Sequence, residues 1–110
     1  MRDRPASIRA AGSAWLFHAN GMHARPAIKL TKLARRFSSS LVVGVSPDGP
    51  WTDAKSIAKV MGMKTPSGVT LYFEAEGSDA HEAVAALIAL VATDFAHADD
   101  GGSGAAPQPT

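Results

Sequence analysis

Turn-forming residues divide this sequence into short segments, and the spacing of apolar residues within each segment limits the folds that the chain can adopt. Asn20–Gly21, Ser46–Pro50 and Pro66–Gly68 are typical of turns. The intervening segments predict strands over residues 14–19, 41–45, 51–54 and 69–75, and helices that begin near residues 23, 56 and 79. The order β-α-β-β-α-β-α predicts an α+β fold, an open-faced two-layer β-sandwich whose four-stranded, mostly antiparallel sheet carries three helices on one face.

Apolar residues recur at helical spacing in the first and the last expected helix. They are Ala27, Leu30, Leu33, Ala34 and Phe37 in the first, and Val84, Leu87, Ile88, Val91 and Phe95 in the last. Pro26 falls in the first turn of its helix, where a missing N–H group costs nothing. Ser56 is expected to cap the short middle helix, and Ser78 or Asp79 to cap the last one, with Glu82 completing a capping box.

The length and composition indicate one globular domain. The chain has 110 residues, of which 45% are hydrophobic and 19% charged, so it is too apolar to be disordered. Cysteine is absent, which excludes disulfides, thiolate catalysis, zinc fingers and iron–sulfur clusters. The longest apolar run, Ala83–Ala92, is too short to span a bilayer, and the basic N-terminus lacks the apolar segment of a secretory signal. We therefore expect a cytoplasmic location and no membrane insertion.

The composition also predicts where the domain begins and ends. Residues 1–13 mix Arg, Ala, Ser and Gly and are expected to form a flexible arm. Residues 97–110 are rich in Gly, Ala and Pro and are expected to form a flexible tail, or a linker that leads to another domain. The folded domain is then expected to cover residues 14–96.

Charge is distributed unevenly along the chain. All eleven Lys and Arg residues lie within residues 1–64, where only three Asp residues oppose them, whereas residues 65–110 hold seven acidic residues and no Lys or Arg. The stretch from residue 21 to 47 has five basic residues and no acidic one. Such a locally basic surface would attract an acidic partner or a phosphate group.

The segment from Asn20 to Pro26 has the residues of an anion site. His23 stands where a turn enters a helix, and the backbone N–H groups of Ala24 and Arg25 have no partner within the helix. The guanidinium of Arg25 suits phosphate oxygens, and an imidazole beside such a site is a good phosphoryl acceptor. Gly21 permits a sharp turn behind the ring, and the amide of Asn20 can brace that turn or reach a phosphoryl oxygen.

Three motifs resemble one known family. Gly21–Ala27, with the sequence Gly-Met-His-Ala-Arg-Pro-Ala, resembles the active-site signature of the histidine-containing phosphocarrier protein (HPr) family of the bacterial phosphoenolpyruvate-dependent sugar phosphotransferase system. Asp53–Ile57 resembles the family segment that precedes its short second helix, and Glu74–Asp79 resembles the segment before its last helix. The resemblance covers about residues 14–95, and the pairing of the His motif with the Ser motif is specific.

The resemblance implies a role for each matching residue. His23 would be phosphorylated on Nδ1 by enzyme I and would pass the phosphoryl group to a IIA domain, while Arg25 neutralises it. Ser56 would be the target of an HPr serine kinase/phosphorylase, although it could equally be a plain N-cap. Around His23, the expected docking surface has an apolar patch and a basic rim, composed of Met22, Ile57 and Met61 and of Lys32, Arg35 and Lys59. The chain would be a monomeric carrier that forms a covalent intermediate, with no metal, no cofactor and no turnover substrate.

The sequence departs from the family pattern at a few positions. Asp53 stands where Asn is usual and places a negative charge near Ser56. Lys64 stands near a position usually held by Gly after the second helix, and Pro66–Ser67 make the next turn unusual. These differences put recognition by the kinase in doubt but do not touch the His23 motif.

Other functions remain open at this point. Within the same fold, the chain could be a regulatory, nitrogen-type phosphotransfer paralogue or the carrier module of a multidomain phosphotransferase. The basic stripe could bind nucleic acid, but no aromatic residue interleaves it to stack on bases. A metal-dependent hydrolase is disfavoured because the four histidines lack ligand spacing. The stripe is Arg25, Lys29, Lys32, Arg35 and Arg36, and the histidines are His18, His23, His81 and His97.

Overall fold

The computed structural model describes residues 8–18 and 21–95 of the chain. Four strands and three helices follow one another in the expected order β-α-β-β-α-β-α. They are β1 (Arg9–Leu16), α1 (Ala24–Ala34), β2 (Ser40–Gly44), β3 (Thr52–Asp53), α2 (Ile57–Gly62), β4 (Val69–Glu76) and α3 (Ala80–Ala92).

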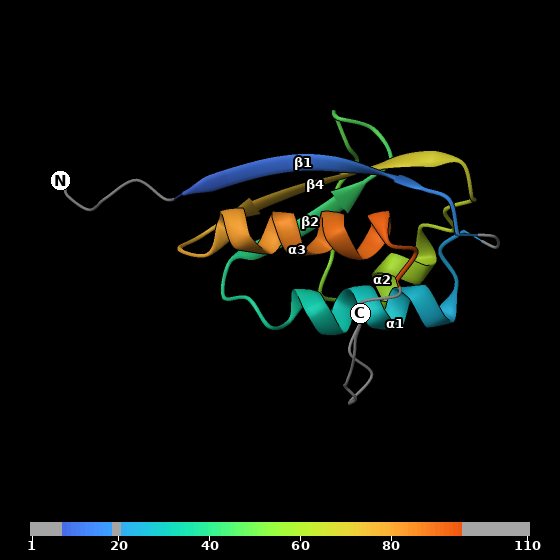
Figure 1. Cartoon of the computed structure of the whole chain (residues 1–110), viewed down its shortest axis with the longest axis horizontal. Coiled ribbons are helices and arrows are strands. Elements are labelled where there is room, and N and C mark those ends of the chain that lie inside the picture. The colour runs from blue at the N-terminus through green and yellow to red at the C-terminus, as the bar shows by residue number, and fades with distance from the viewer. Residues whose placement is uncertain (1–7, 19–20, 96–110) are drawn as a thin grey trace, which may run out of the picture.

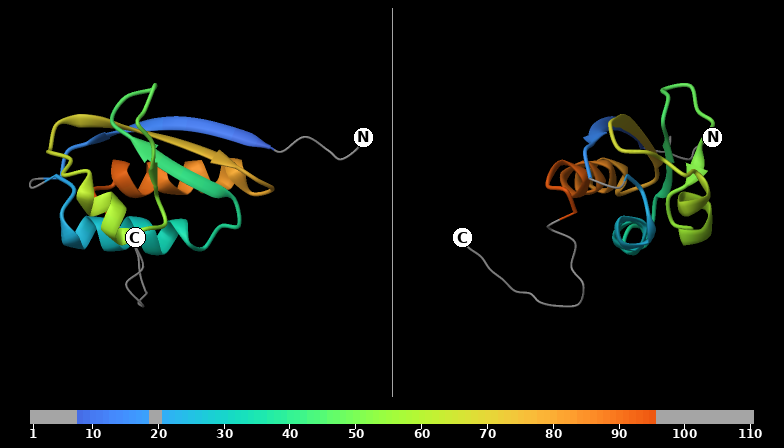
Figure 2. Two further views of the ribbon diagram at one scale, coloured as in Figure 1. Left: turned by 180° about the vertical axis from the view of Figure 1, so that it is seen from behind. Right: turned by 90° about the vertical axis from the view of Figure 1, so that its right-hand side faces the viewer.

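The four strands form one antiparallel sheet in the spatial order β1-β4-β2-β3. The long outer strand β1 pairs with β4 along its whole length, from Arg9 opposite Glu76 to Leu16 opposite Val69. All three helices lie on one side of this sheet, with α1 and α3 running beneath it and α2 beside α1 (Figures 1 and 2). The structure therefore confirms the open-faced α+β sandwich.

The core lies between the sheet and the helices, and the period of each element explains which residues enter it. In β4, Leu71 and Phe73 are buried and alternate with exposed Glu74 and Glu76, as a strand with one covered face requires. Each fully buried Leu or Phe side chain stabilises the fold by roughly 1.5–3 kcal/mol. The helices add buried residues at helical spacing, which include Ala27, Leu30 and Ala34 from α1 and Val84, Leu87 and Val91 from α3.

The prediction for the first strand was wrong at both ends. We expected it over residues 14–19, but β1 begins at Arg9 and ends at Leu16, so residues 9–13 are paired in the sheet and do not form an arm. These residues are mostly small and show little alternation, which is why the sequence pattern missed them. Gly12 lies close to α3: a Cβ at this position would lie 2.5 Å from Cδ1 of Ile88, so the end of that side chain would have to move. Ala19 and the expected tail lie outside the described residues.

The expected capping box at the start of α3 does not form. Asp79 is the N-cap residue, but its side chain makes no cap hydrogen bond. Instead, its carboxylate accepts hydrogen bonds from the backbone N–H groups of Ser38 and Ser39, each at 2.9 Å, and from the Ser39 hydroxyl. The Ser39 hydroxyl, followed by the Ser38 N–H group, lowers the pKa of Asp79 to about 2. The carboxylate therefore joins the loop after α1 to the start of α3, a long-range contact that local sequence does not reveal.

The last apolar residue of the expected α3 stripe lies beyond the helix. α3 ends at Ala92, and Phe95 has a φ of +66°, so the backbone reverses after the helix. The Phe95 N–H group donates to the carbonyl of Leu90 at 2.7 Å, and the ring remains buried at 2% exposure. Phe95 is thus a core residue, as expected, but it reaches the core from a turn.

Candidate functional site

A tight turn leads from β1 into α1 and depends on Gly21. The N–H group of Gly21 donates to the carbonyl of His18 at 2.9 Å, and Gly21 has a φ of +69°, which other residues rarely adopt. A Cβ at this position would overlap the carbonyl oxygen of Thr65 and lie 2.7 Å from the carbonyl carbon of Pro66. The next N–H group, that of Met22, donates to the same Thr65 carbonyl at 2.8 Å. The turn is therefore held against the loop before β4, and the sharp turn expected at Gly21 is confirmed.

His23 is the N-cap residue of α1, but its side chain makes no cap hydrogen bond. Its carbonyl accepts the first helical hydrogen bond, from the N–H group of Ala27 at 2.9 Å. Ala24 and Arg25 are exposed, and the helix supplies no partner for their N–H groups. These amides, with the positive end of the helix dipole, provide a binding place for an anion beside the imidazole.

One nitrogen of the His23 ring is buried. Nε2 is buried and has no hydrogen-bond partner among residues 8–18 and 21–95. A phosphoryl group on a nitrogen closed off in this way would require the surrounding residues to move, which disfavours Nε2 as the acceptor atom. The burial of Nε2 thus agrees with Nδ1 phosphorylation, the chemistry implied by the family resemblance.

The ring of His18 lies beside that of His23. Their centroids are 5.0 Å apart and the ring planes are inclined by 59°. The His18 ring also meets the ring of Phe95 edge-on, with centroids 5.7 Å apart. In the sequence, His18 was a candidate only as a metal ligand. The one signal that could have placed it here is the sequence Asn20–Gly21, which is typical of a turn, and the N–H group of Gly21 does donate to the His18 carbonyl.

The basic residues of α1 are spread along the helix. Arg25 is at its start, and exposed Lys32 lies in its last turn. The Nε atom of Arg35 donates to the carbonyl of Lys55 at 2.9 Å and so links the end of α1 to the segment before α2. Lys29 donates from Nζ to the carbonyl of Phe95 at 3.3 Å, which ties the turn after α3 to the helix that carries His23.

The second helix lies beside α1 and carries the other expected site residues. Ser56 is its N-cap and is half-buried, and its Oγ accepts a hydrogen bond from the N–H group of Lys59 at 3.3 Å. Lys59 and Met61 are exposed, the latter at 39%, and Ile57 is half-buried. The structure thus places these three residues on a helix that adjoins α1, with surface available for contact.

The expectation that Met22 is exposed was wrong. Its side chain is only 6% exposed and belongs to the hydrophobic core. The cause is the hydrogen bond between its N–H group and the Thr65 carbonyl, which holds the backbone against the neighbouring loop while the side chain packs inward. Asn20, expected near the phosphate, lies outside the described residues.

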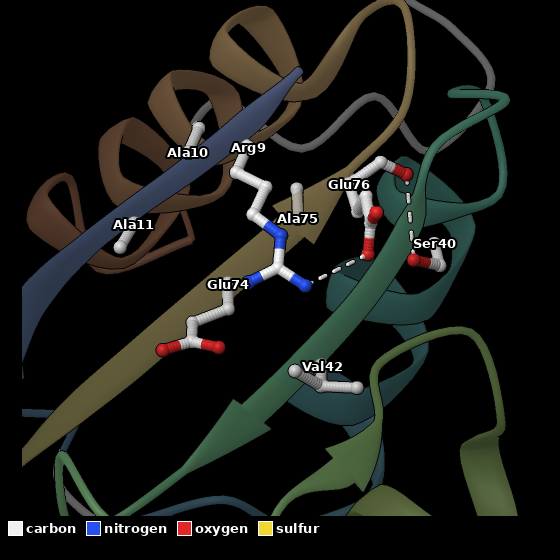
Figure 3. A pocket seen from close by; sticks show the side chains of 8 residues that line it. All are labelled: Arg9, Ala10, Ala11, Ser40, Val42, Glu74, Ala75 and Glu76. Atoms are coloured by element: carbon white, nitrogen blue, oxygen red, sulfur yellow. Dashed lines mark hydrogen bonds and ion pairs between the residues drawn. The ribbon is translucent and has the colours of Figure 1, made fainter. Parts of the chain in front are cut away.

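A shallow pocket of about 420 Å³ lies on the face of the sheet away from the helices (Figure 3). Its charged lining consists of Arg9, Glu74 and Glu76, and Arg9 pairs with Glu76 at 3.5 Å. The two carboxylates would repel a phosphoryl group, and His23 belongs to the helical layer on the other face of the sheet. We therefore do not include this pocket in the candidate site.

Two further features of the described residues bear on function. They contain no group of three or more His, Asp or Glu side chains placed to hold a metal ion. Among their helices, none is both long and apolar enough to cross a membrane.

Comparison with known proteins identifies the family. The family model described as "PTS HPr component phosphorylation site" matches residues 16–93. The phosphocarrier protein HPr of Cupriavidus necator is 45% identical over 75 residues, which cover 68% of this chain and 82% of that protein. The HPr of Haemophilus influenzae is 38% identical over 74 residues, or 67% of this chain and 85% of that protein.

A solved structure gives the same result in three dimensions. The crystal structure of HPr-C-His from Thermoanaerobacter tengcongensis superposes with a TM-score of 0.71 at 32% identity, covering 78% of this chain and 94% of that one. The matched residues 16–93 include the turn at Gly21, His23 and the helix α1 that follows it. The chain belongs to the HPr family of phosphocarrier proteins of the phosphotransferase system.

Proposed function

We propose that this chain accepts a phosphoryl group on Nδ1 of His23 from enzyme I, which takes it from phosphoenolpyruvate, and passes it to a IIA domain of a sugar permease. The single observation that carries the proposal is the position of His23. It caps α1 without using its side chain, has its Nε2 atom buried, and stands beside exposed first-turn residues.

The chemistry is a transfer between two nucleophiles. The lone pair of Nδ1 attacks phosphorus, the N–P bond forms, and the bond from phosphorus to the donor breaks with its electron pair remaining on the donor. Transfer to the acceptor reverses these roles. The chain is regenerated after each cycle and has no substrate of its own to turn over, so it is a covalent carrier rather than a turnover enzyme.

The groups around His23 would stabilise the phosphoryl oxygens. The N–H groups of Ala24 and Arg25 supply the positive end of the helix dipole, and the Arg25 guanidinium supplies a full charge two residues from the ring. The amide of Asn20, the residue before Gly21 in the sequence, is proposed to reach the same oxygens. No acidic residue occurs between residues 21 and 47 to oppose this field.

Partner docking would use the two adjoining helices. An apolar centre formed by Ile57 and Met61 would be surrounded by basic side chains, and this combination suits rapid, transient exchange with acidic partners. Of the expected apolar patch, Met22 no longer takes part, since it is buried. The basic residues assigned to the rim are Lys32, Arg35 and Lys59.

Ser56 is the proposed site of regulatory phosphorylation by an HPr serine kinase/phosphorylase. A phosphate there would stand at the start of α2, next to the docking residues Ile57 and Lys59, and would repel acidic partners. The carboxylate of Asp53, whose Oδ1 accepts from the Lys55 N–H group at 2.9 Å, lies in the same segment and would disfavour the added charge.

The test is phosphorylation by phosphoenolpyruvate and a purified enzyme I, read by intact mass before and after acid treatment. We expect one acid-labile phosphate on the wild type and none on His23→Ala. His81→Ala is the matched control, since it removes an exposed histidine from the first turn of α3. Addition of a IIA domain to the phosphorylated wild type is expected to remove the phosphate. A wild-type chain that stays unmodified, with an enzyme I that phosphorylates a known HPr, would overturn the proposal.

A further inference from the structure

We infer that His18 is a positioning residue for His23: its Nδ1 accepts a hydrogen bond from the Nε2–H group of His23 and thereby keeps the lone pair on Nδ1 of His23. The inference rests on the proposed function, because it concerns how the acceptor nitrogen of that site is prepared.

The first observation is a pair of complementary buried atoms. Nδ1 of His18 and Nε2 of His23 are both buried, and neither has a hydrogen-bond partner among the residues that the structure describes. Buried polar atoms without partners are rare in native proteins and call for an explanation. One neutral imidazole has both a donor and an acceptor nitrogen, so two neighbouring rings can satisfy each other.

The second observation is the distance between the rings. With centroids 5.0 Å apart, the two imidazole rings are neighbours, although Nδ1 of His18 and Nε2 of His23 are not hydrogen-bonded in the structure. The inference requires the rings to reorient so that these two atoms come within hydrogen-bonding distance. Catalytic hydrogen bonds are commonly long in a free protein and tighten when the partner binds. The inclination of 59° between the planes is compatible with an edge-to-edge contact.

The third observation is that His18 is held in place by the rest of the molecule. Its carbonyl accepts the hydrogen bond of the Gly21 turn, and its ring packs edge-on against Phe95. Phe95 in turn is buried, and its carbonyl accepts a hydrogen bond from Lys29 of α1. Such a supported side chain can orient the ring beside it, as an outer residue orients a metal-binding or catalytic histidine.

The bond would assist the transfer at each stage. In the neutral His23 ring, a proton held on Nε2 leaves the Nδ1 lone pair free to attack phosphorus. When the Nδ1–P bond forms and the donor leaves with its electron pair, Nε2 keeps its proton and the ring gains positive charge. An acceptor aimed at that N–H group stabilises the charge where it develops.

Thr65 offers a competing partner. Its Oγ1 is also buried without a partner among the described residues, and its backbone contacts the turn through Met22. His18 is favoured because the structure records direct ring contact between the two histidines. Thr65→Val separates the two possibilities, since it removes the hydroxyl and preserves the shape of the side chain.

The test compares His18→Asn with His18→Phe. Asn presents its Oδ1 at the same number of bonds from the backbone as Nδ1 of His, so it keeps the hydrogen-bond acceptor. Phe keeps the aromatic packing on Phe95 but has no hydrogen-bond acceptor. Ring ¹⁵N shifts of neutral His23, measured by NMR on the unphosphorylated full chain, report the tautomer, and amide spectra report folding. We expect the Nε2–H tautomer to dominate in the wild type and His18→Asn, and to lose its dominance in His18→Phe.

Phosphorylation rates with enzyme I supply the second readout. We expect His18→Phe to slow by about ten-fold or more, the scale on which outer positioning residues act, and His18→Asn to retain most of the wild-type rate. An unchanged tautomer in folded His18→Phe, a wild type protonated mainly on Nδ1, or a tautomer that responds to Thr65→Val instead would each overturn the inference. Failure of enzyme I to phosphorylate the wild type would overturn the proposed function while leaving the tautomer measurement interpretable.

Discussion

The N-termini of α1 and α2 both carry a residue that the family pattern associates with phosphate, yet their side chains are used differently. At α2, Ser56 closes the helix end by accepting a hydrogen bond from the Lys59 N–H group. At α1, the His23 side chain makes no cap hydrogen bond to the first amides of the helix. A closed helix end contributes to stability, whereas an open end leaves amides and an imidazole available for an incoming phosphoryl group.

The surroundings of the two ends reinforce the contrast. α1 extends over eleven residues and has Arg25 in its first turn, while α2 has six residues and follows Asp53. A longer helix with a nearby cation holds an anion better than a short one behind a carboxylate. A phosphoryl group is therefore expected to be held more readily at the start of α1 than at the start of α2.

The largest effect is expected from removing the cation at the open end. Arg25→Gln should slow phosphoryl transfer from enzyme I by about a hundred-fold, because one aimed donor to a developing negative charge has this effect. Arg36→Gln, which removes an exposed basic residue just after α1, is the matched control. Rates from rapid-quench sampling would check this, and equal rates for the two variants would remove Arg25 from the site.

The next effect concerns the turn that presents His23. Gly21→Ala should lower the free energy of unfolding by at least about 2 kcal/mol, because the residue must adopt a left-handed conformation and its Cβ would meet the Thr65 and Pro66 backbone. Gly62→Ala at the end of α2 is the control, since a Cβ there meets nothing within 4 Å. Urea titrations measure both, and a Gly21→Ala variant as stable as the control would contradict the strain assigned to this turn.

A smaller effect is expected at the closed end. Ser56→Ala should cost about 1 kcal/mol of stability through loss of the cap, without slowing phosphorylation of His23. Ser56→Asp should restore much of the stability, because Asp is also a good N-cap. Thermal unfolding and the enzyme I assay separate the two properties. A slow His23 reaction in Ser56→Ala would show that the two helix ends are not independent.

The smallest effect belongs to the third helix, whose N-cap side chain binds a different loop. Hydrogen bonds hold the pKa of Asp79 at about 2, below its model-peptide value of 3.8, so its contribution is present above pH 4 and is lost as pH falls toward 2. Asp79→Asn should therefore be less stable than the wild type near pH 7, with the difference shrinking between pH 4 and pH 2. Asp48→Asn controls for the loss of one negative charge, and a pH-independent difference would refute the mechanism.

These helix ends also show how far the sequence alone could predict the structure. The turn at Gly21 and the cap at Ser56 were predicted because they depend on residues adjacent in the chain. The burial of Met22 and the contact of His18 with Phe95 were not, because Thr65 and Phe95 come from distant segments. The start of β1 was missed for the same reason, since its small residues are set by pairing with β4 and by the approach of α3.

The most direct measurement is to locate the phosphoryl group by NMR after phosphorylation of ¹⁵N-labelled protein with phosphoenolpyruvate and enzyme I. Coupling of phosphorus to a ring nitrogen identifies both the residue and the atom. We expect the phosphoryl group on Nδ1 of His23, because Nε2 is buried and the His23 side chain makes no cap hydrogen bond to the first amides of α1. A phosphoryl group on Nε2 of His23, or on Oγ of Ser56, would contradict the contrast drawn between the two helix ends.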